Sequence, residues 1–172
     1  MESENTKKPF FSVIIPTYNR GPLLKNAIES VLKQTFNDYE IIVIDNSSKD
    51  NTEEIVKNFQ NKCIKFLKIQ NNGSIAKSRN QGIKNSHCEW IAFLDSDDIW
   101  YEDRLETAYN FIKNNDNYQV VCSNELIINS INKSRKIWKY GPYKKNFYKH
   151  LIKFGNYCTT TGGAVNKKYL ID

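Results

Sequence analysis

The chain has 172 residues, 40% hydrophobic and 26% charged, which is typical of a single globular domain, and its net charge is +6. No apolar run approaches the roughly 20 residues that span a bilayer, and the polar start Met1–Glu4 predicts no secretory signal peptide. The four cysteines are widely spaced, so we expect reduced thiols in a cytoplasmic protein and neither a disulfide framework nor a zinc site.

Strand and helix patterns alternate along the chain after a polar tail at residues 1–9, which is expected to be disordered. The expected strands are Phe11–Ile15, Glu40–Ile44, Ile64–Ile69, Trp90–Leu94, Val120–Ser123 and Tyr157–Val165. The expected helices are Leu23–Leu32, Asn51–Phe59 with a capping box at its start, Ile75–Asn85, Arg104–Asn114 and Phe147–Phe154. This alternation predicts a single α/β domain with a mostly parallel sheet covered by helices on both faces.

The fourth expected strand runs directly into three carboxylates, Asp95, Asp97 and Asp98. Such a group of negative charges is repulsive unless a cation compensates it. Oxygen ligands in a tight turn suit Mg²⁺ or Mn²⁺ shared with the phosphate oxygens of a substrate. The alternative is a solvated acidic turn before the next helix.

Polar loops follow the first four expected strands, at residues 16–20, 45–48, 71–74 and 95–98. Parallel sheets bind ligands beyond the carboxyl ends of their strands, so these four loops should share one rim. The first loop has no Gly-x-Gly-x-x-Gly and the chain has no P-loop, which argues against a dinucleotide-binding dehydrogenase or a P-loop enzyme.

Taken together and in order, five segments resemble family 2 glycosyltransferases, which have the GT-A fold. They are Ser12–Arg20, Ile28–Thr35, Ile42–Asp50, Ala76–Ile83 and Phe93–Asp98. The resemblance implies a GT-A domain over residues 10–172, with a nucleotide-binding half at 10–125 and the incomplete start of an acceptor-side region at 126–172.

Transferred residue by residue, the resemblance implies a nucleotide-binding set of Pro16, Thr17, Tyr18, Arg20, Asp45, Lys77, Arg79, Asp95 and Ser96. Tyr18 would stack on a uracil-like base, and Asp45 would accept the ring N–H of uridine. Asp97 would be the main ligand of Mn²⁺ or Mg²⁺, with Asp95 as the second. The structural alternatives are a surface role for Tyr18, a turn or cap for Asp45, and an ion pair with glutamates of a neighbouring helix for Arg79.

The resemblance further implies inverting transfer of a sugar, most naturally from a UDP-sugar, to an acceptor hydroxyl in polysaccharide or glycoconjugate synthesis. The family's general base lies in an acidic motif beyond a strand similar to Thr159–Val165, and this chain ends at Asp172 before such a motif. Asp172 and Glu125 are weak candidates for it, so a nucleotide-sugar binding module without turnover is the alternative. A second departure is Asn46-Ser47, where the family usually has an acidic residue and glycine.

Positive charge concentrates late in the chain, with 10 Lys/Arg and one acidic residue in 126–172, against 15 Lys/Arg and 18 Asp/Glu in 1–125. The tract Lys133–Lys153 interleaves these charges with aromatic residues, which suits an anionic membrane surface or a phosphorylated acceptor. A solvated basic face is the alternative, and no motif supports a nucleic-acid partner. We therefore expect a glycan, lipid-linked or protein acceptor and peripheral association with the inner face of an anionic membrane.

Overall fold

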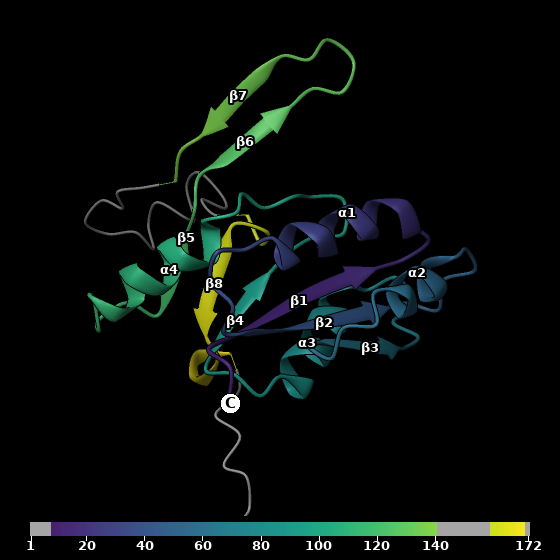
Figure 1. The fold of residues 1–172 in the computed structure, drawn as a ribbon, viewed down its shortest axis with the longest axis horizontal. Helices are drawn as coiled ribbons and strands as arrows, with labels where there is room; N and C mark the ends of the chain where they lie inside the picture. The colour runs from purple at the N-terminus through teal and green to yellow at the C-terminus, as the bar shows by residue number, and fades with distance from the viewer. Residues whose placement is uncertain (1–7, 141–158, 171–172) are drawn as a thin grey trace, which may run out of the picture.

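The computed structural model describes residues 8–140 and 159–170. Its central sheet has six strands in the order β3-β2-β1-β4-β8-β5, and a separate hairpin is formed by β6 and β7 (Figure 1). The strands are β1 (Phe11–Thr17), β2 (Tyr39–Asp45), β3 (Ile64–Lys68), β4 (Trp90–Phe93), β5 (Val120–Cys122), β6 (Glu125–Ile128), β7 (Arg135–Trp138) and β8 (Gly163–Asn166). The α-helices are α1 (Gly21–Leu32), α2 (Thr52–Asn58), α3 (Ile75–Asn85) and α4 (Arg104–Lys113).

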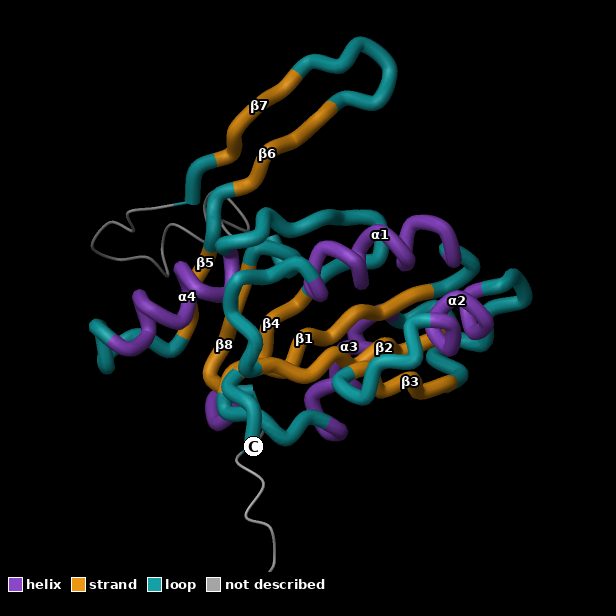
Figure 2. Tube along the Cα trace, in the orientation of Figure 1, coloured by secondary structure: helices purple, strands orange, loops and turns teal. Residues whose placement is uncertain are grey.

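The predicted α/β class is confirmed, because β1, β2, β3 and β4 pair in parallel, while β8 pairs antiparallel with both β4 and β5. β1 lies at the centre, and the chain builds outward through β2 and β3 before crossing to β4 on the other side of β1. Helices lie on both sides of the sheet (Figure 2). The strand order therefore reverses between β1 and β4, where ligands of open α/β sheets usually bind.

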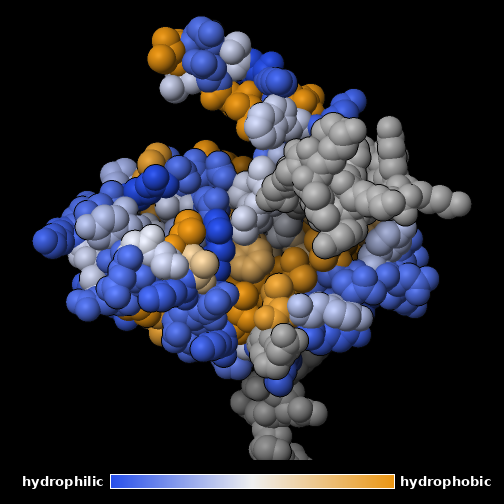
Figure 3. Space-filling view, turned by 180° about the vertical axis from the view of Figure 1, so that it is seen from behind, coloured by the Kyte–Doolittle hydropathy of each residue, from blue (hydrophilic) through white to orange (hydrophobic). Residues whose placement is uncertain are grey.

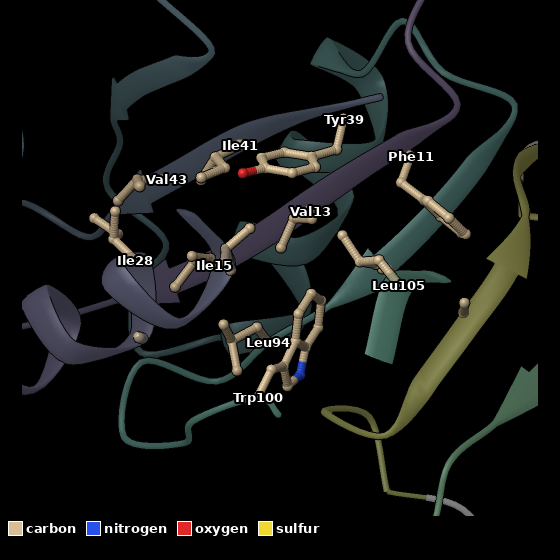
Figure 4. Close-up of a cluster of buried hydrophobic side chains, with 14 of the residues drawn as sticks. Phe11, Val13, Ile15, Ile28, Tyr39, Ile41, Val43, Leu94, Trp100 and Leu105 are labelled. Carbon is tan, nitrogen blue, oxygen red and sulfur yellow. The ribbon is translucent and has the colours of Figure 1, made fainter. Parts of the chain in front are cut away.

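Alternate residues of the buried strands supply two separate apolar layers, as the two-residue period of a strand requires. Val13 and Ile15 face the layer formed with α1, α2 and α4, which also contains Trp100 and Leu105 (Figure 4). Ile14 faces the opposite layer, where Ile83 of α3 packs. Near-continuous apolar sequence in β1 and β2 therefore reflects burial on both faces.

The expected elements agree with the structure to within a few residues, and α3 has the predicted limits. β1 continues through Pro16 because its pairing with β4 ends at Ile14, leaving only the β2 ladder beyond. The predicted capping box before α2 is wrong, since Asn51 makes no side-chain cap bond and Asp50 accepts the N–H of Thr52. The sixth expected strand begins later, at Gly163.

The hairpin β6–β7 was not predicted. Three expectations lie wholly or partly outside the described residues: the helix Phe147–Phe154, the tail at 1–7 and part of the tract Lys133–Lys153.

Cys63 and Cys88 are free, as expected, but Cys122 is disulfide-bonded, so the expectation of a reduced thiol is wrong there. None of the helices in the described residues combines the length and apolar character that a membrane span requires.

Candidate functional site

The strand register brings the first, second and fourth predicted loops to one rim of the sheet. Thr17 at the end of β1 pairs with Asp45 at the end of β2, and Leu94 donates its backbone N–H to Ile14 at 3.1 Å. Because these strands are parallel, their carboxyl ends lie at the same edge of the sheet (Figure 1). Pro16, Thr17, Asp45 and Asp95 therefore come from neighbouring strand ends, although up to 79 residues separate them in sequence.

The loop after β1 is held against the loop after β2. The N–H of Asn19, whose φ is +49°, donates to Ser48 Oγ at 2.8 Å, and Asn19 Oδ1 accepts the N–H of Lys49 at 2.7 Å. Tyr18 remains 51% exposed, so its ring is accessible to a base. The hydroxyl of Thr17 is buried without a hydrogen-bond partner in the described structure.

Asp45 is fully buried at the end of β2. The backbone N–H of Ser48 lies 3.2 and 3.1 Å from its two carboxylate oxygens, and the Ser48 hydroxyl donates to Oδ1. The carboxylate therefore holds the turn that follows it, which is the structural alternative that the sequence offered for Asp45. A carboxylate oxygen has more than one lone pair, so hydrogen-bonding capacity remains, but with 0% of Asp45 exposed a ligand N–H reaches it only when the loop 46–48 moves aside.

Asn46 and Ser47, which depart from the family pattern, retain defined structural roles. Asn46 Oδ1 accepts the N–H of Asn71 at 2.8 Å, which ties the second loop to the third. Ser47 has a φ of +54°, a conformation that favours glycine, and its hydroxyl donates to the Ile69 carbonyl at 2.8 Å. The amide and hydroxyl thus support the loop that an acidic residue and a glycine usually form.

The acidic turn after β4 is neutralised by arginines. Arg79 Nη2 lies 2.7 Å from Asp95 Oδ1, and Arg20 Nη1 lies 2.7 Å from Asp97 Oδ2. The first pair is largely shielded from solvent, whereas the second is about half exposed. Two guanidinium groups, from α3 and from the loop after β1, therefore supply the positive charge that the sequence pattern required.

The third carboxylate of the turn behaves differently. The Asp98 side chain is exposed, but its partial desolvation raises its pKa, and the neighbouring Asp97 and Asp95 raise it further, against a hydrogen bond with Thr161 that lowers it. Ser96 is buried within the turn. Within residues 8–140 and 159–170, no group of three or more His, Cys, Asp or Glu side chains is placed to hold a metal ion alone.

Lys77 and Arg79 lie on α3, after the third loop. Ser74 caps this helix by accepting the N–H of Lys77, and the Lys77 side chain is exposed. Arg79 turns toward Asp95 rather than toward a helix glutamate, and its Nε is buried without a partner among the described atoms. A buried donor without a partner, on a guanidinium that pairs with the acidic turn, is a candidate contact for a ligand oxygen.

Sequence reasoning did not identify the turn 159–162, which ties the acidic turn to the rest of the protein. Thr161 Oγ1 accepts the N–H of Asp95 at 3.2 Å. Its carbonyl accepts Trp100 Nε1 and Arg104 Nη2, each at 3.3 Å, and the Arg104 guanidinium lies 3.9 Å from the centre of the Trp100 ring. These contacts join segments about 60 residues apart, so no local pattern could reveal them.

Arg104 and Glu125 both contact the turn 159–162. Burial lowers the pKa of Arg104 to about 10, against the attraction of Glu125. Burial raises the pKa of Glu125, which accepts hydrogen bonds from Tyr140, at 2.9 Å, and from Thr159. Both Glu125 oxygens therefore accept hydrogen bonds, one from the end of the hairpin and one from the turn 159–162. This arrangement gives Glu125 a structural role in holding the two segments together.

Comparison with known proteins gives a consistent result. Residues 12–171 match the family described as glycosyl transferase family 2. Poly(ribitol-phosphate) beta-N-acetylglucosaminyltransferase TarP of Staphylococcus aureus is 41% identical over 115 residues, covering 64% of this chain and 35% of TarP. UDP-Glc:alpha-D-GlcNAc-diphosphoundecaprenol beta-1,3-glucosyltransferase WfgD of Escherichia coli is 38% identical over 122 residues, covering 67% of this chain and 48% of WfgD.

The solved structures agree. S. aureus TarS 1–349 in complex with UDP-GlcNAc superposes with a TM-score of 0.76 at 26% identity, covering 94% of this chain and 48% of TarS 1–349. The chain spans less than half the length of each of these relatives. Since the family match extends over residues 12–171, nearly the whole chain, the chain belongs to glycosyl transferase family 2.

Proposed function

We propose that the rim formed by the carboxyl ends of β1, β2 and β4 binds a nucleoside diphosphate sugar, with UDP as the nucleotide, and that the protein transfers the sugar to an acceptor hydroxyl. The observation that carries the proposal is the convergence of Tyr18, Asp45 and the acidic turn on one rim of the sheet. The likeness to TarS in complex with UDP-GlcNAc supports the choice of UDP.

Each group has a role that its position supports. The exposed ring of Tyr18 stacks on the base, and Asp45 accepts the ring N–H of uracil. Arg79 Nε and Lys77 supply donors and charge for the ribose or diphosphate. Asp95 lies beside Arg79, where it orients the ribose. These assignments place the nucleotide across the ends of β1, β2 and β4.

A divalent ion, Mn²⁺ or Mg²⁺, fits this donor set. Asp97 and Asp95 offer two carboxylates at an open rim, and Mg²⁺ is commonly held by one or two carboxylates together with substrate phosphates. The lack of a three-ligand group among the described residues suits an ion shared with the diphosphate. When bound, it would stabilise the charge that develops on the leaving diphosphate.

The proposed reaction is inverting. The acceptor oxygen forms a bond to the anomeric carbon, the bond from that carbon to the diphosphate oxygen breaks, and UDP leaves with the electron pair. Removal of the hydroxyl proton by a positioned base contributes about 10²–10⁴-fold in such reactions. Glu125 is poorly suited to that step because both its oxygens already accept hydrogen bonds.

A second candidate function is binding of a nucleotide sugar without turnover. The engagement of Asp95, Asp97 and Glu125 by other groups favours it, since none of these carboxylates is free to act as a base. Both functions require UDP binding, so the two are separated by turnover. Release of UDP when an acceptor is supplied supports the transferase, and binding without release supports the module.

The proposed division places nucleotide binding in residues 10–125 and the start of the acceptor side in 126–172. We also propose that the protein works in the cytoplasm at the inner face of a membrane, in polysaccharide or glycoconjugate synthesis. The name of WfgD specifies a diphosphoundecaprenol-linked acceptor, which supports a lipid-linked acceptor here. No nucleic-acid partner is proposed.

The decisive experiment is a thermal-shift and calorimetric screen of UDP, GDP, CDP and dTDP, each with and without Mn²⁺. We expect stabilisation by UDP that depends on the metal and exceeds that by the other three nucleotides. Equal responses to all four nucleotides would contradict the role of Asp45. No response to any of them would contradict the proposed function altogether.

A further inference from the structure

The hairpin β6–β7 extends away from the body of the protein (Figure 1). β6 and β7 pair with each other and form a separate two-stranded sheet. Its turn is held by Asn129, whose Oδ1 accepts the N–H groups of Ile131 and Asn132 at 2.9 and 3.1 Å. Two-stranded hairpins are only marginally stable in water without an apolar face packed on something else, so a hairpin that joins no other strand among the described residues requires explanation.

Both faces of the hairpin carry apolar side chains. Directly paired residues share a face, so Leu126 and Ile137 lie on one side and Ile127 on the other. Ile131 in the turn is 91% exposed, and Ile137 is 60% exposed. The space-filling view shows hydrophobic and hydrophilic atoms interspersed on the projecting arm (Figure 3). Apolar side chains exposed on two faces suit a surrounding medium better than a single flat protein surface.

The charges of the hairpin have one sign. Residues 126–140 contain four basic residues and no acidic one: Lys133, Arg135, Lys136 and Lys139. All four are exposed, and no described carboxylate forms an ion pair with any of them. Lys136 Nζ lies 5.9 Å from the centre of the Trp138 ring. Aromatic and aliphatic side chains among basic ones are typical of segments that lie at the interface of an anionic membrane.

We propose that residues 126–140 form a membrane-docking arm, whose exposed apolar side chains, Ile131 at the turn and Ile137 and Trp138 on β7, enter the interface of an anionic bilayer while its basic residues contact the headgroups. A second copy of the chain is a poorer occupant. A symmetric contact would bring two hairpins together, each with four positive charges and no negative one, and like charges oppose such an interface.

The base of the arm adjoins the proposed donor site. Glu125, the first residue of β6, accepts a hydrogen bond from Thr159, two residues before the Thr161 that holds Asp95. Docking of the arm would therefore keep the proposed donor site near the membrane, where a lipid-linked acceptor presents its hydroxyl. This positional consequence rests on the proposed function, whereas membrane binding itself does not.

The first test is co-sedimentation of the full chain with vesicles of phosphatidylcholine alone or of equal parts phosphatidylcholine and phosphatidylglycerol. We expect binding to the anionic vesicles only. Raising the salt from about 0.1 M to about 1 M shortens the Debye length from roughly 10 Å to roughly 3 Å and should release most of the protein. Equal binding to both kinds of vesicle, or to neither, would overturn the proposal.

Variants locate the contact. Each basic residue near an anionic surface contributes roughly fivefold in affinity, so Lys136→Glu should weaken binding about 25-fold. Lys62→Glu is the matched control, because Lys62 is an exposed lysine before β3, the strand at the opposite edge of the sheet from β5. Ile131→Ser should weaken binding while leaving far-UV circular dichroism unchanged. Equal losses in the Lys62 and Lys136 variants would overturn the assignment to the arm.

Tryptophan fluorescence gives an independent readout. Trp90 and Trp100 are 4% and 7% exposed, whereas Trp138 on the arm is 44% exposed. Anionic vesicles should therefore shift the emission to the blue in the natural protein but not in Trp138→Phe, which should still sediment. A shift that persists in Trp138→Phe would contradict insertion of the arm.

Two further measurements separate this inference from its alternatives. The size of the protein without vesicles should be that of a monomer and unchanged in Lys136→Glu, and a dimer abolished by that substitution would assign the arm to self-association. UDP binding by Lys136→Glu should equal that of the natural protein. Vesicle binding without any UDP binding would refute the proposed function alone, and UDP binding without vesicle binding would refute the arm alone.

Discussion

Arg20, after β1, and Asp97, after β4, form an ion pair at the rim of the sheet, with 2.7 Å between Nη1 and Oδ2. Both side chains are about half exposed, so the pair contributes little to folding stability. Its importance is electrostatic, because it balances the carboxylate that we propose as the metal ligand. A bound divalent ion and diphosphate would offer a partner of opposite charge to each member of the pair.

The first prediction concerns Asp97→Asn, which keeps the shape of the side chain and removes its charge. We expect metal-dependent UDP affinity to fall about tenfold to a hundredfold, since hydrogen bonds and contacts of charged groups are worth about 1.5–3 kcal/mol. Isothermal titration calorimetry with and without Mn²⁺ measures it. Asp103→Asn is the control, because Asp103 is exposed and makes no side-chain cap bond. Equal effects of the two substitutions would remove Asp97 from the site.

A second prediction tests base recognition by Asp45. Uracil presents an N–H at the position where cytosine presents an acceptor, so Asp45→Asn should weaken UDP binding and strengthen CDP binding relative to UDP. A reversed hydrogen bond should change the ratio of affinities by about tenfold or more. Ser48→Ala is the control, because it removes a donor to Asp45 without altering the carboxylate. An unchanged ratio would restrict Asp45 to its turn.

The third prediction assigns a positioning role to Thr161. Thr161→Val removes the hydroxyl that accepts the Asp95 N–H, whereas the backbone carbonyl that binds Trp100 and Arg104 remains. UDP affinity should fall about threefold to tenfold, the range for one hydrogen bond. Because the Thr161 hydroxyl lowers the pKa of Asp98, that pKa should also rise, which NMR titration detects. Thr161→Ser should restore both properties, and a Ser variant no better than Val would contradict the assignment.

The sequence predicted the strands and helices well because both local signals and burial agreed in them. β1 and β2 are apolar throughout, as strands buried on two faces must be, and α3 is bounded by a serine cap and a change to extended backbone at Ser86. The hairpin β6–β7 was missed for a physical reason. Glu125–Ile128 and Arg135–Trp138 have apolar residues on both faces, so neither shows the alternation of a half-buried strand.

Only the part of the site that follows from the parallel pairing of the strands was predictable from the sequence. Once the strands were placed, the carboxyl ends of β1, β2 and β4 had to meet, so the shared rim followed from topology. The source of the compensating charge did not follow, because the contacts of Arg20 with Asp97 and Arg79 with Asp95 depend on how α1 and α3 pack. Thr161 had no sequence signal, since its partners lie about 60 residues away.

A fourth prediction concerns pH. Asp98 is exposed, and its partial desolvation raises its pKa above the ordinary value of 3.8, an effect to which Asp97 and Asp95 add. A carboxyl with a raised pKa stabilises the fold fully below 3.8, and this contribution is lost as the pH rises through the raised value. Asp98→Asn should therefore be more stable than the natural protein at neutral pH, with a difference that vanishes in acid.

Glu40 is the control, because its pKa is shifted in the opposite direction to that of Asp98. Burial alone would raise its pKa, but hydrogen bonds from Ser12 and His87 outweigh burial and lower it below 4.5. Its stabilising contribution is present above 4.5 and is lost as the pH falls through the lowered value. Urea unfolding of Asp98→Asn and Glu40→Gln across this range should give pH slopes that change in opposite directions. Changes of the same sign would contradict the environment described for Asp98.

The fifth prediction tests the close approach of α3 to β1. A β-carbon on Gly82 would lie 2.5 Å from Cγ2 of Ile14, a fully buried side chain of the central strand. Helix propensity alone would make Gly82→Ala stabilising by about 1 kcal/mol. The clash reverses the sign, and overpacking of this kind costs about 1–3 kcal/mol. Urea unfolding should show the loss, whereas Lys84→Ala on the exposed face of the same helix should change stability by less than about 0.5 kcal/mol.

A double-mutant cycle separates this clash from a general weakening of α3. Ile14→Ala alone should cost about 2–5 kcal/mol, because it leaves a cavity beneath the helix. Combined with Gly82→Ala, the added methyl group would enter the space that Ile14 vacates, so the double variant should be more stable than the sum of the single losses predicts. Strict additivity would mean that the two positions are not in contact and that another cause determines the effect of Gly82→Ala.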